Sequence, residues 1–550
     1  MVGDRDFDFI IVGSGAASII AALVAQEAGA KPLILEKTDK VGGSTAMSGG
    51  VAWMPVNPLQ QAAGVNDNYE MARAYLDACA GDAGPASSPE RRHAFLTEAP
   101  RVVRYLQDRG MEFVHAEGYS DYHEGQKPGG VARSRSLVGQ IYDARRLGKW
   151  RGLLRRNAGG PPILMHEASA LGHGGRTWAS RKAYVRVALR MLRNMLGADL
   201  VGNGMAIQGR LLEIALKAGI PIWLNAGVRD FLVEDGRVVG VEADVDGQVR
   251  QLKASKGVLI NAGGFSHNLA MRQQYQQQPT GTDWTNANPG DTGEMQQAAM
   301  ALGADVAIME QCWWVSVSVT PDGKKLIHPF DMSKPYSLLV DTGGERFVNE
   351  STSYMEVGIQ MYARDKIVPA VPSWLISDSR HRNRYRWSGQ PGGKPTQEWV
   401  DSGYMIVADT IEELAEKCGI PPAALRGTVD RFNGFAARGV DEDFHRGESA
   451  YDRFAGDSTV KPNPNLGAIE QAPFYAVRLF PGDVGTCGGL MTDEFAQVLR
   501  KDGSVIPGLY ATGNSTASVM GRSYPGAGAS IGASMTFGFI AARHATGANV

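Results

Sequence analysis

The chain has 550 residues, a formal net charge of −2 and 43% hydrophobic residues, which is an ordinary globular composition. This length predicts two or more domains with large cores. The slightly acidic balance argues against a nucleic-acid-binding protein, because such domains are usually strongly basic. The four cysteines show neither CxxC pairing nor metal-ligand spacing, so we expect reduced thiols, a cytoplasmic location and no metal site.

The first elements in chain order predict a nucleotide-binding unit. An apolar run over residues 7–12 is typical of a buried strand, and the sequence GSGAAS at 13–18 predicts a tight turn followed by a helix. The N-terminus of that helix would face a pyrophosphate, because its free backbone N–H groups attract anions. Ser18 replaces the third glycine of the usual pattern, so we expect the helix slightly further from the strand.

A second strand and a second glycine-rich loop extend this unit. Residues 32–35 form another apolar run, and Glu36 at its end lies about 20 residues beyond the turn, where an acidic side chain accepts hydrogen bonds from a ribose. The sequence GGST at 42–45 follows as a loop able to wrap a diphosphate. Further on, Pro100 is expected to open a helix that ends at Gly110.

A strongly basic segment follows. Residues 145–193 contain twelve Lys or Arg and a single acidic residue, Glu167. Within this segment, residues 180–196 predict a helix with basic residues along one stripe and apolar residues on the rest. Such a helix can lie on anionic lipid, or its apolar side can pack on its own protein while the arginines are solvated or paired. Both interpretations stay open, the first as a peripheral membrane contact through residues 145–196.

The chain shows no apolar span of transmembrane length. Its first predicted strand also begins too early for a signal peptide to precede it. We therefore expect neither membrane crossing nor export.

The middle of the chain predicts a further cofactor-binding segment, followed by a region without nucleotide motifs. Residues 205–218 predict a helix, and the next stretch predicts strands with turns at 235–236 and 246–247. At 261–265 an apolar strand and a glycine pair bring the backbone close to the cofactor again. Residues 313–483 are richer in proline, tryptophan and charge and carry no nucleotide motif, so we interpret them as an inserted second domain.

The C-terminal segment completes the cofactor prediction. Residues 508–510 predict a strand end before Gly513 and Asn514, and the sequence GAG at 526–528 opens an apolar helix over about residues 529–541. The N-terminus of this helix would stabilise the negative charge that reduction places on a flavin pyrimidine. Two such segments at opposite ends of the chain predict FAD, because NAD-only domains lack the pair. We expect the FAD to be non-covalent, since no histidine precedes position 93.

The predicted cofactor contacts come from the two N-terminal loops, the strand ends of the middle region and the C-terminal segment. They are Gly13, Ser14, Gly15, Ala16, Ala17, Glu36, Lys37, Gly43, Ser44, Thr45, Ser48, Gly49, Gly50, Val228, Ala262, Gly263, Gly264, Asn268, Asp291, Gly513, Asn514, Gly528, Ser530 and Ile531.

Several long motifs carry a resemblance to a known family. They are GGSTAMSGG followed by AWMPVNPL, GYSDYHE, GERFVNESTSY, PSWLISDSRHRNRY, YDRFAGDSTVKPNPNLG, and PGDVGTCGGLMTDE leading to MGRSYPGAGASIGASMTFG. On these motifs nearly the whole chain resembles 3-ketosteroid Δ1-dehydrogenases, within the fumarate reductase and succinate dehydrogenase flavoprotein superfamily.

The resemblance implies an α/β fold in which a Rossmann-like FAD-binding domain is split around an α+β catalytic (cap) domain. The FAD-binding domain would comprise residues 1–312, with the basic insertion at about 140–200, and residues 484–550. The catalytic domain would comprise residues 313–483, and the active site would lie in the cleft between the two.

The resemblance also implies the reaction, which is the removal of hydrogens from carbons 1 and 2 of a 3-ketosteroid A ring, as in steroid or sterol degradation. Tyr524 and the backbone N–H of Gly528 would polarise the carbon-3 oxygen. Tyr354 would take the proton from carbon 2 while a hydride passes from carbon 1 to flavin N5. A further aromatic hydroxyl assists the base, and we place it at Tyr122. The family usually has a second tyrosine where this chain has His123, so His123 is the alternative helper.

The electron acceptor is expected to be a quinone or another carrier that is not oxygen. Three other functions are weighed against this one. A 3-ketosteroid Δ4-(5α)-dehydrogenase would share Tyr354 and Tyr524 but need not have the helper. A fumarate or succinate enzyme would place an arginine where this chain has Tyr524. A flavin-binding module without catalysis would not explain the paired tyrosines.

Overall fold

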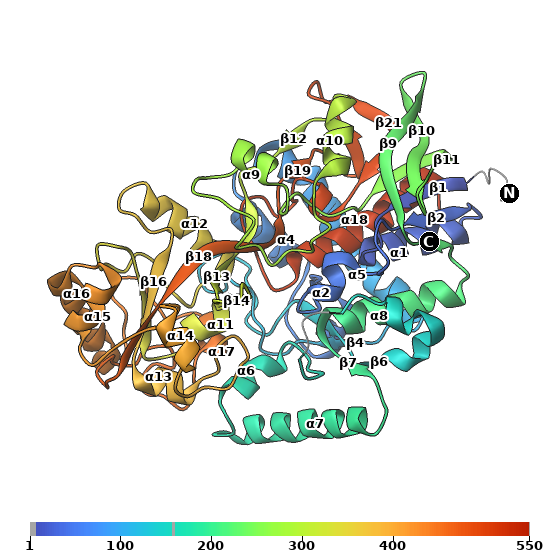
Figure 1. Ribbon diagram of the computed structural model, residues 1–550. Coiled ribbons are helices and arrows are strands. Elements are labelled where there is room, and N and C mark those ends of the chain that lie inside the picture. The colour runs from blue at the N-terminus through green and yellow to red at the C-terminus, as the bar shows by residue number, and fades with distance from the viewer. Residues whose placement is uncertain (1–6, 157–159, 549–550) are drawn as a thin grey trace.

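A parallel sheet close to both chain termini forms the core of the part drawn on the right in Figure 1. The structure is a computed structural model that describes residues 7–156 and 160–548. In sheet order the strands are β20 (Gln497–Leu499), β21 (Val505–Ala511), β11 (Gln248–Ile260), β1 (Phe7–Val12), β2 (Pro32–Leu35) and β8 (Ile222–Trp223). β1 pairs in parallel with β2 and β11, and β11 pairs in parallel with β21. The predicted strands at 7–12 and 32–35 are confirmed.

Helices from both ends of the chain cover this sheet and pack on one another. α1 (Ala16–Glu27) and α18 (Ala529–Thr546) contact the sheet, α5 (Pro89–Asp108) packs on α18, and α8 (Asn203–Lys217) packs on α1 and on the short α2 (Gly43–Met47). α1 and α18 contact each other although they belong to opposite ends of the sequence. The nucleotide-binding unit and the C-terminal segment therefore pack together in one part of the molecule.

The predicted turns of the middle region are two hairpin turns. They join β9 (Ala226–Glu234) to β10 (Arg237–Val245) and β10 to β11. Asp235 and Gly236 have φ of 49° and 75°, and Asp246 and Gly247 have φ of 50° and 81°. Positive φ at both central residues is what a type I′ turn requires, so Asp-Gly at each position explains the hairpins.

The expectation that Pro100 opens a helix is wrong. Pro100 lies inside α5, which begins eleven residues earlier with Ser88 accepting a hydrogen bond from the Arg91 N–H and with Pro89 at its first position. Phe95 before the proline and Val102 after it are both buried on the same helix. This shared packing outweighs the backbone hydrogen bond that an internal proline removes.

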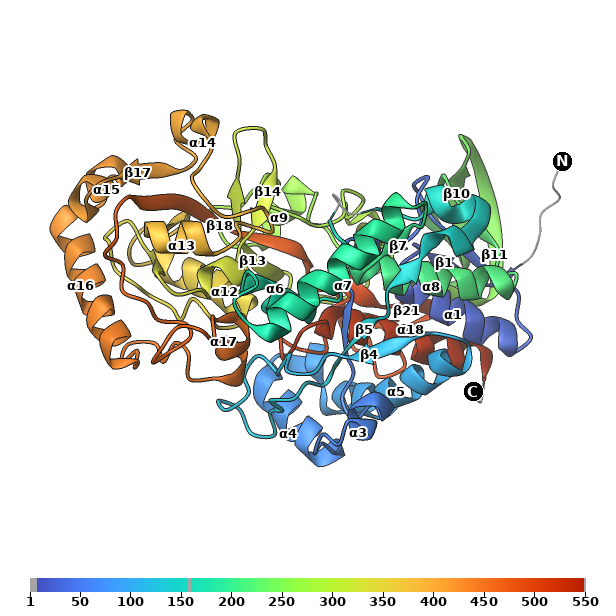
Figure 2. The same cartoon turned by 90° about the horizontal axis from the view of Figure 1, so that it is seen from below.

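The second part of the molecule, on the left in Figures 1 and 2, is built on an antiparallel sheet. In order its strands are β14 (Lys325–Ile327), β13 (Cys312–Val319), β18 (Phe474–Thr486), β16 (Ser373–Ser377) and β15 (Ser337–Val340), and β17 (Ile406–Ala408) also pairs with β18. Its helices include α11 (Pro329–Met332), α12 (Tyr354–Asp365), α15 (Ile411–Cys418), α16 (Pro422–Arg438) and α17 (Ala450–Ala455). The predicted boundary between residues 483 and 484 falls inside β18, which leads from this sheet back toward the first domain.

The basic segment contains α6 (Glu167–Gly172) and α7 (Trp178–Met195), and its residues 157–159 lie outside the described part of the chain. α7 runs along the lower edge of the molecule in Figure 1. Its inward side buries Ser180, Ala183 and Val187. At 100° per residue its outward side carries one apolar stripe that continues just past the helix end. The exposed fractions along that stripe are Trp178 75%, Val185 59%, Leu189 56%, Leu192 49% and Leu196 78%.

Neither interpretation of the basic helix describes it completely. Arg186 and Arg190 reach inward and pair with the buried Glu167 over 2.9 and 2.6 Å. These two arginines are therefore paired, as the second interpretation expected, but the apolar stripe faces outward and does not pack on the described part of this chain. None of the helices in the described ranges is long and apolar enough to cross a membrane.

Candidate active site

A continuous cavity of about 680 Å³ is lined by residues of both parts of the molecule. It begins at the carboxyl ends of β1, β2 and β11, where open parallel sheets bind nucleotides, and it extends to the wall formed by β13, β14 and α11. Among the predicted cofactor residues, all but four line this cavity. The exceptions are Ala16, Ala17, Gly264 and Asn268. Asn268 instead caps α9 (Leu269–Tyr275) by accepting a hydrogen bond from the Met271 N–H.

The first glycine turn is shaped by a close approach of two backbones. Gly13 has a φ of 98°, and a Cβ at this position would lie 2.2 Å from the Asn261 carbonyl oxygen, so only glycine fits. Ser14 Oγ donates to Glu36 Oε2 over 2.5 Å, and the Thr38 N–H donates to Oε1 over 3.0 Å. These bonds hold the Glu36 carboxylate at the cavity wall, where it can accept hydrogen bonds from a ribose.

The cavity wall also offers polar groups that the protein leaves unused. Asn286 Nδ2 and Asn288 Oδ1 are buried without a hydrogen-bond partner in the described ranges, and both residues line the cavity. Burial raises the pKa of Asp291 to about 7, and its Oδ2 accepts a hydrogen bond from Ser44 Oγ over 3.2 Å. Buried polar groups normally find partners, so these orphaned amides fit a polar ligand such as FAD. Spacing in the sequence did not single out Asn286 or Asn288.

Three tyrosines from distant parts of the chain meet in the same cavity, next to the part that the predicted cofactor residues line. The ring centroids of Tyr354 and Tyr524 are 5.3 Å apart, and the Tyr122 ring lies 5.5 Å from the first and 5.6 Å from the second. All three line the cavity. Burial raises the pKa of both Tyr354 and Tyr122 well above the usual range for a phenol, because a charged oxygen would lose its hydration there.

The structure brings Tyr122, and not His123, into this cluster. The Tyr122 hydroxyl is buried and has no hydrogen-bond partner among the described residues. His123 does not line the cavity, and its Nε2 lies 3.4 Å from Ser523 Oγ. Burial lowers the pKa of His123, so its ring is neutral near pH 7.

Sequence reasoning did not select three further aromatic residues of the site. Tyr451 lies 4.3 Å from Tyr122 between ring centroids, and Tyr119 packs beside both. Trp313 packs 4.8 Å from Tyr524, and its Nε1 donates to Asn514 Oδ1 over 3.0 Å. Tyr451 opens one of the long motifs, but nothing in that motif distinguishes it from a structural tyrosine.

Gly528 has a left-handed backbone conformation and an N–H group that no protein atom accepts a hydrogen bond from in the described ranges. It precedes α18 with a φ of 85°, and a Cβ there would lie 2.1 Å from the Val51 carbonyl oxygen. Its carbonyl accepts from the Trp53 N–H over 3.1 Å, whereas its own N–H has no partner in the described part of the chain. A free N–H at a helix N-terminus is a donor suited to an oxyanion or a polarised carbonyl.

The loop at 524–528 is fastened to the segment that carries Tyr122. The Tyr122 N–H donates to the Pro525 carbonyl over 2.9 Å, and Ser136 Oγ donates to the Ala527 carbonyl over 2.8 Å. Such cross-links between two loops fix their spacing more tightly than packing alone.

A buried ion pair lies behind these two loops. Asp121, next to Tyr122, accepts hydrogen bonds from Trp53 Nε1 over 2.7 Å and from Arg135 Nη1 over 2.5 Å. Because both charges are almost fully buried, removal of either partner would leave the other unpaired. The pair therefore holds the main chain at Tyr122 in place.

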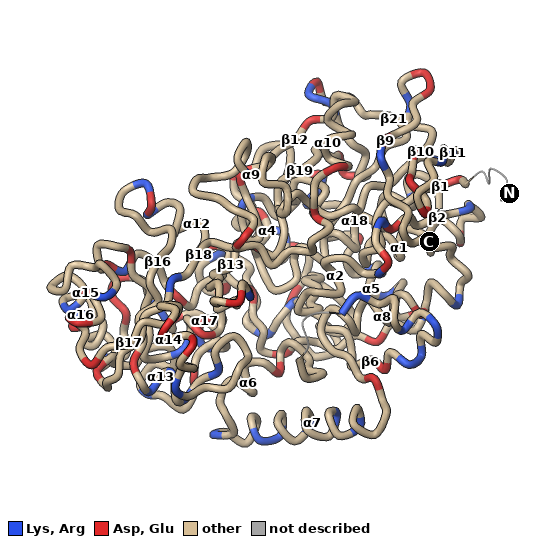
Figure 3. The backbone as a smooth tube through the Cα atoms, viewed as in Figure 1, with Lys and Arg blue, Asp and Glu red and all other residues tan. Residues whose placement is uncertain are grey.

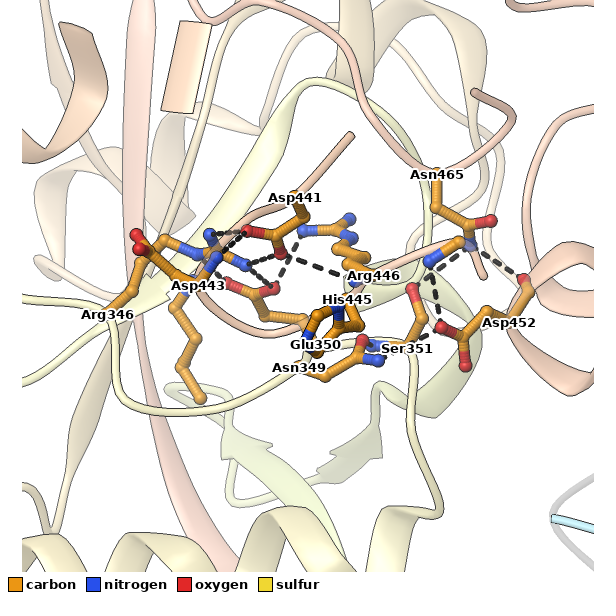
Figure 4. Close-up of polar contacts among 12 residues, drawn as sticks. Arg346, Asn349, Glu350, Ser351, Asp441, Asp443, His445, Arg446, Asp452 and Asn465 are labelled. Carbon is orange, nitrogen blue, oxygen red and sulfur yellow. Dashed lines mark hydrogen bonds and ion pairs between the residues drawn. The ribbon is translucent and has the colours of Figure 1, made fainter. Parts of the chain in front are cut away.

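A second polar network, drawn in Figure 4, supports Tyr354 and Tyr451. Asn349 Nδ2 donates to Asp452 Oδ2 over 3.0 Å and so links the segment before Tyr354 to the helix that carries Tyr451. Glu350 forms ion pairs with two arginines of the same domain over 2.8 and 3.0 Å. These contacts explain why the motifs around both tyrosines are rich in charged and amide side chains.

Comparison with known proteins identifies the family of this chain. A family model described as an FAD binding domain matches residues 8–531. The 3-oxosteroid 1-dehydrogenase of Mycolicibacterium smegmatis is 41% identical, over 98% of this chain and 97% of that protein. This chain belongs to the 3-oxosteroid 1-dehydrogenase family. It is an FAD-binding oxidoreductase, as the two glycine-rich segments predicted.

Two further relatives of the 3-oxosteroid 1-dehydrogenase family bear on the fold and the substrate. The crystal structure of the 3-ketosteroid Δ1-dehydrogenase from Sterolibacterium denitrificans in complex with 1,4-androstadiene-3,17-dione matches with a TM-score of 0.93 and 34% identity, over 98% of this chain and 99% of that chain. The 4-oxocyclohexanecarboxylate 2-dehydrogenase of Sinomonas cyclohexanicum is 33% identical, over 98% of this chain and 93% of that protein. The α/β flavoprotein fold is thus the family's fold.

Proposed function

We propose that this protein catalyses the FAD-dependent 1,2-dehydrogenation of 3-ketosteroids in steroid or sterol degradation. The observation that carries the proposal is the convergence of Tyr354, Tyr524 and Tyr122 beside the free Gly528 N–H in one cavity with the cofactor region. The names of the relatives support the substrate class.

The electrophilic part of the site would bind the carbon-3 oxygen. The Tyr524 hydroxyl and the Gly528 N–H would both donate to this oxygen, and polarising it acidifies the hydrogens on carbon 2. Tyr524 keeps its hydroxyl near the start of α18, where it lies 3.2 Å from Ser530 Oγ. FAD, when bound, supplies the acceptor for the hydride that leaves carbon 1.

The basic part of the site would remove the proton from carbon 2. Tyr354 is the first residue of α12, so it stands at the end of the helix that carries a partial positive charge. The unpaired Tyr122 hydroxyl is able to donate a hydrogen bond to that oxygen as the proton arrives or leaves. Both effects lower the cost of phenolate character, which burial alone makes high.

The test uses androst-4-ene-3,17-dione with an artificial electron acceptor. Tyr354→Phe and Tyr524→Phe should each lose at least about 100-fold in turnover per bound flavin, the usual scale for a lost base or oxyanion donor. Tyr105→Phe is the matched control, because Tyr105 is buried and its hydroxyl is also unpaired, but it packs on Phe539 away from the cavity. Near-normal turnover by Tyr354→Phe would place the base elsewhere.

The same substrate separates the alternatives. It already contains the 4,5 double bond, so a Δ4-(5α)-dehydrogenase cannot oxidise it at that position, whereas a Δ1-dehydrogenase forms the 1,4-diene. Turnover of fumarate or succinate in place of the steroid would favour the dicarboxylate enzymes. Absence of turnover with every steroid and dicarboxylate would favour a flavin-binding module without catalysis.

We also propose that α7 is a peripheral membrane contact of an otherwise cytoplasmic enzyme. Its outward apolar stripe supports this, because monomeric proteins rarely leave such a stripe to water. Lys182 and Arg193 flank the stripe without an ion pair in the described residues, and Figure 3 shows basic positions along the helix. Ser169 of α6 bonds to the Phe454 carbonyl, and Met165 before α6 lines the cavity, so the contact would lie near the substrate's path.

This location fits the chemistry of the partners. A steroid partitions into lipid, and so does a quinone, which we propose as the class of electron acceptor. The four cysteines are free thiols, which is consistent with a reducing compartment.

Vesicle sedimentation tests the membrane contact. Replacing Leu189, Leu192 and Leu196 with serine should abolish binding to anionic vesicles, because the apolar stripe supplies the insertion. Replacing Lys182 and Arg193 with glutamine should weaken binding and reduce its salt dependence, at roughly 1 kcal/mol for each charge. A triple variant that binds like the wild type would refute the proposal, and the ordinary solvated helix would remain.

A further inference from the structure

β13 leads along the cavity from the tyrosines to the wall at its far end. Trp313 on β13 packs against Tyr524, Val315 follows on the same side of the strand, and both line the cavity. Val317 comes next on that side and pairs with Ile327 of β14, which also lines the cavity. Four residues of extended strand span about 13 Å, so Ile327 marks the end remote from the reacting ring.

A carboxylate stands in this remote wall. Asp331 of α11 lines the cavity, and its side chain retains 10% of its accessible surface. Its Oδ2 accepts a hydrogen bond from His328 Nδ1 over 2.7 Å and another from the Ser388 N–H over 2.7 Å. Its Oδ1 has no partner in the described part of the chain. One oxygen is therefore held by the protein, and the other is free to bind a ligand.

The groups behind Asp331 keep it in a defined orientation. The His328 ring is fully buried, and its Nε2 lies 2.7 Å from Ser318 Oγ. Ser318 Oγ in turn lies 2.7 Å from the Tyr404 hydroxyl. Because a carboxylate only accepts hydrogen bonds, His328 Nδ1 must carry the proton that it shares with Asp331. A side chain whose orientation is set by a chain of buried hydrogen bonds is suited to recognition.

We propose that Asp331 Oδ1 accepts a hydrogen bond from a hydroxyl group at the end of the steroid remote from ring A. This inference rests on the proposed function and names its substrate more closely. A carboxylate oxygen has no proton to give, so it discriminates against a ketone at the same position, whose oxygen also only accepts. Sites built to bind a hydroxyl reject analogues that lack it, because a buried polar group is then left unpaired.

The test compares two steroids with the same ring A, 17β-hydroxyandrost-4-en-3-one and androst-4-ene-3,17-dione. The wild-type enzyme should favour the hydroxyl compound by at least about 10-fold in kcat/KM, chiefly through KM. In Asp331→Asn the amide oxygen can keep the bonds to His328 and Ser388 while the amide nitrogen faces the cavity. This variant should reverse the preference toward the ketone, with little change in kcat for the ketone.

Asp322→Asn is the matched control, because Asp322 lies in the turn between β13 and β14, outside the cavity, and pairs with Lys324. Its substrate ratio should equal that of the wild type. If Asp331→Asn does not accumulate with bound flavin, the 17β-methoxy analogue tests the wild type directly, since it keeps the oxygen but cannot donate. The methoxy compound should lose the advantage of the hydroxyl compound.

Three results would overturn the inference. The first is an equal preference in the wild type and Asp331→Asn, the second is a wild-type enzyme that favours the ketone, and the third is a wild-type enzyme that turns over the hydroxyl and methoxy compounds equally well. Failure of the proposed function looks different, because neither steroid would then be dehydrogenated at carbons 1 and 2.

Discussion

Gly528 offers a sharp test of the electrophilic part of the site. The absence of a side chain lets its backbone approach Val51, and its N–H is the proposed donor to the carbon-3 oxygen. In Gly528→Ala the new Cβ would lie 2.1 Å from the Val51 carbonyl oxygen and 2.7 Å from the Ala52 nitrogen. Both contacts are backbone atoms of a buried strand, so the loop must move by roughly 1 Å to reach ordinary van der Waals distance. An oxyanion donor works only at about 2.7–3.1 Å, so this shift removes the hydrogen bond.

The expected magnitude follows from the lost donor. Removing one such donor costs about 2.7–4 kcal/mol of transition-state stabilisation, which is a loss of about 100- to 1,000-fold in kcat. Gly547 is the matched control, because it ends the same helix with a φ of 70° and a Cβ there would meet nothing within 4 Å. Gly547→Ala should therefore lose only about 1–2 kcal/mol of stability from its left-handed backbone and keep its turnover.

The assay is steroid 1,2-dehydrogenation with saturating FAD, expressed per bound flavin, together with thermal unfolding of each variant. Expressing turnover per flavin separates loss of chemistry from loss of cofactor. Turnover by Gly528→Ala within about fivefold of the wild type would mean that the Gly528 N–H does not bind the carbon-3 oxygen, because a donor of this kind is worth far more.

Two other predictions concern single side chains of the site. Burial raises the pKa of Asp291 to about 7, so its carboxyl is largely protonated below pH 7 and negatively charged above it. Its partner Ser44 belongs to the glycine-rich loop that would hold the diphosphate of FAD, and a negative charge there would repel it. FAD affinity, measured by fluorescence titration of the apoprotein, should fall from pH 6 to pH 8.5 in the wild type and stay level in Asp291→Asn; equal slopes would contradict this. Tyr122→Phe should reduce kcat more than His123→Ala does, and the reverse order would make His123 the helper.

The amino-acid sequence by itself determined the cofactor and the first strands and turns of the nucleotide-binding unit. The strands at 7–12 and 32–35, the glycine turns and the Asp-Gly hairpins depend on residues close together in the chain, so local periodicity and backbone freedom predict them. Nearly all predicted cofactor residues line the cavity for the same reason, since glycine-rich loops at strand ends carry their own signal. Pro100 shows the limit of such local rules. Packing of the helix on both sides of this proline keeps α5 continuous, which the sequence signal did not predict.

Only the tertiary structure decided which side chains meet. Tyr122, Tyr354 and Tyr524 come from segments far apart in the chain, and no spacing rule predicts that Tyr451 joins them or that His123 does not. The outward stripe of α7 and the half-satisfied carboxylate of Asp331 were equally hidden, because the same residue pattern is compatible with either a buried or an exposed face. The periodicity of a sequence predicts that a helix has an apolar and a polar face. Only the packing of the rest of the chain determines which of the two faces is exposed to water.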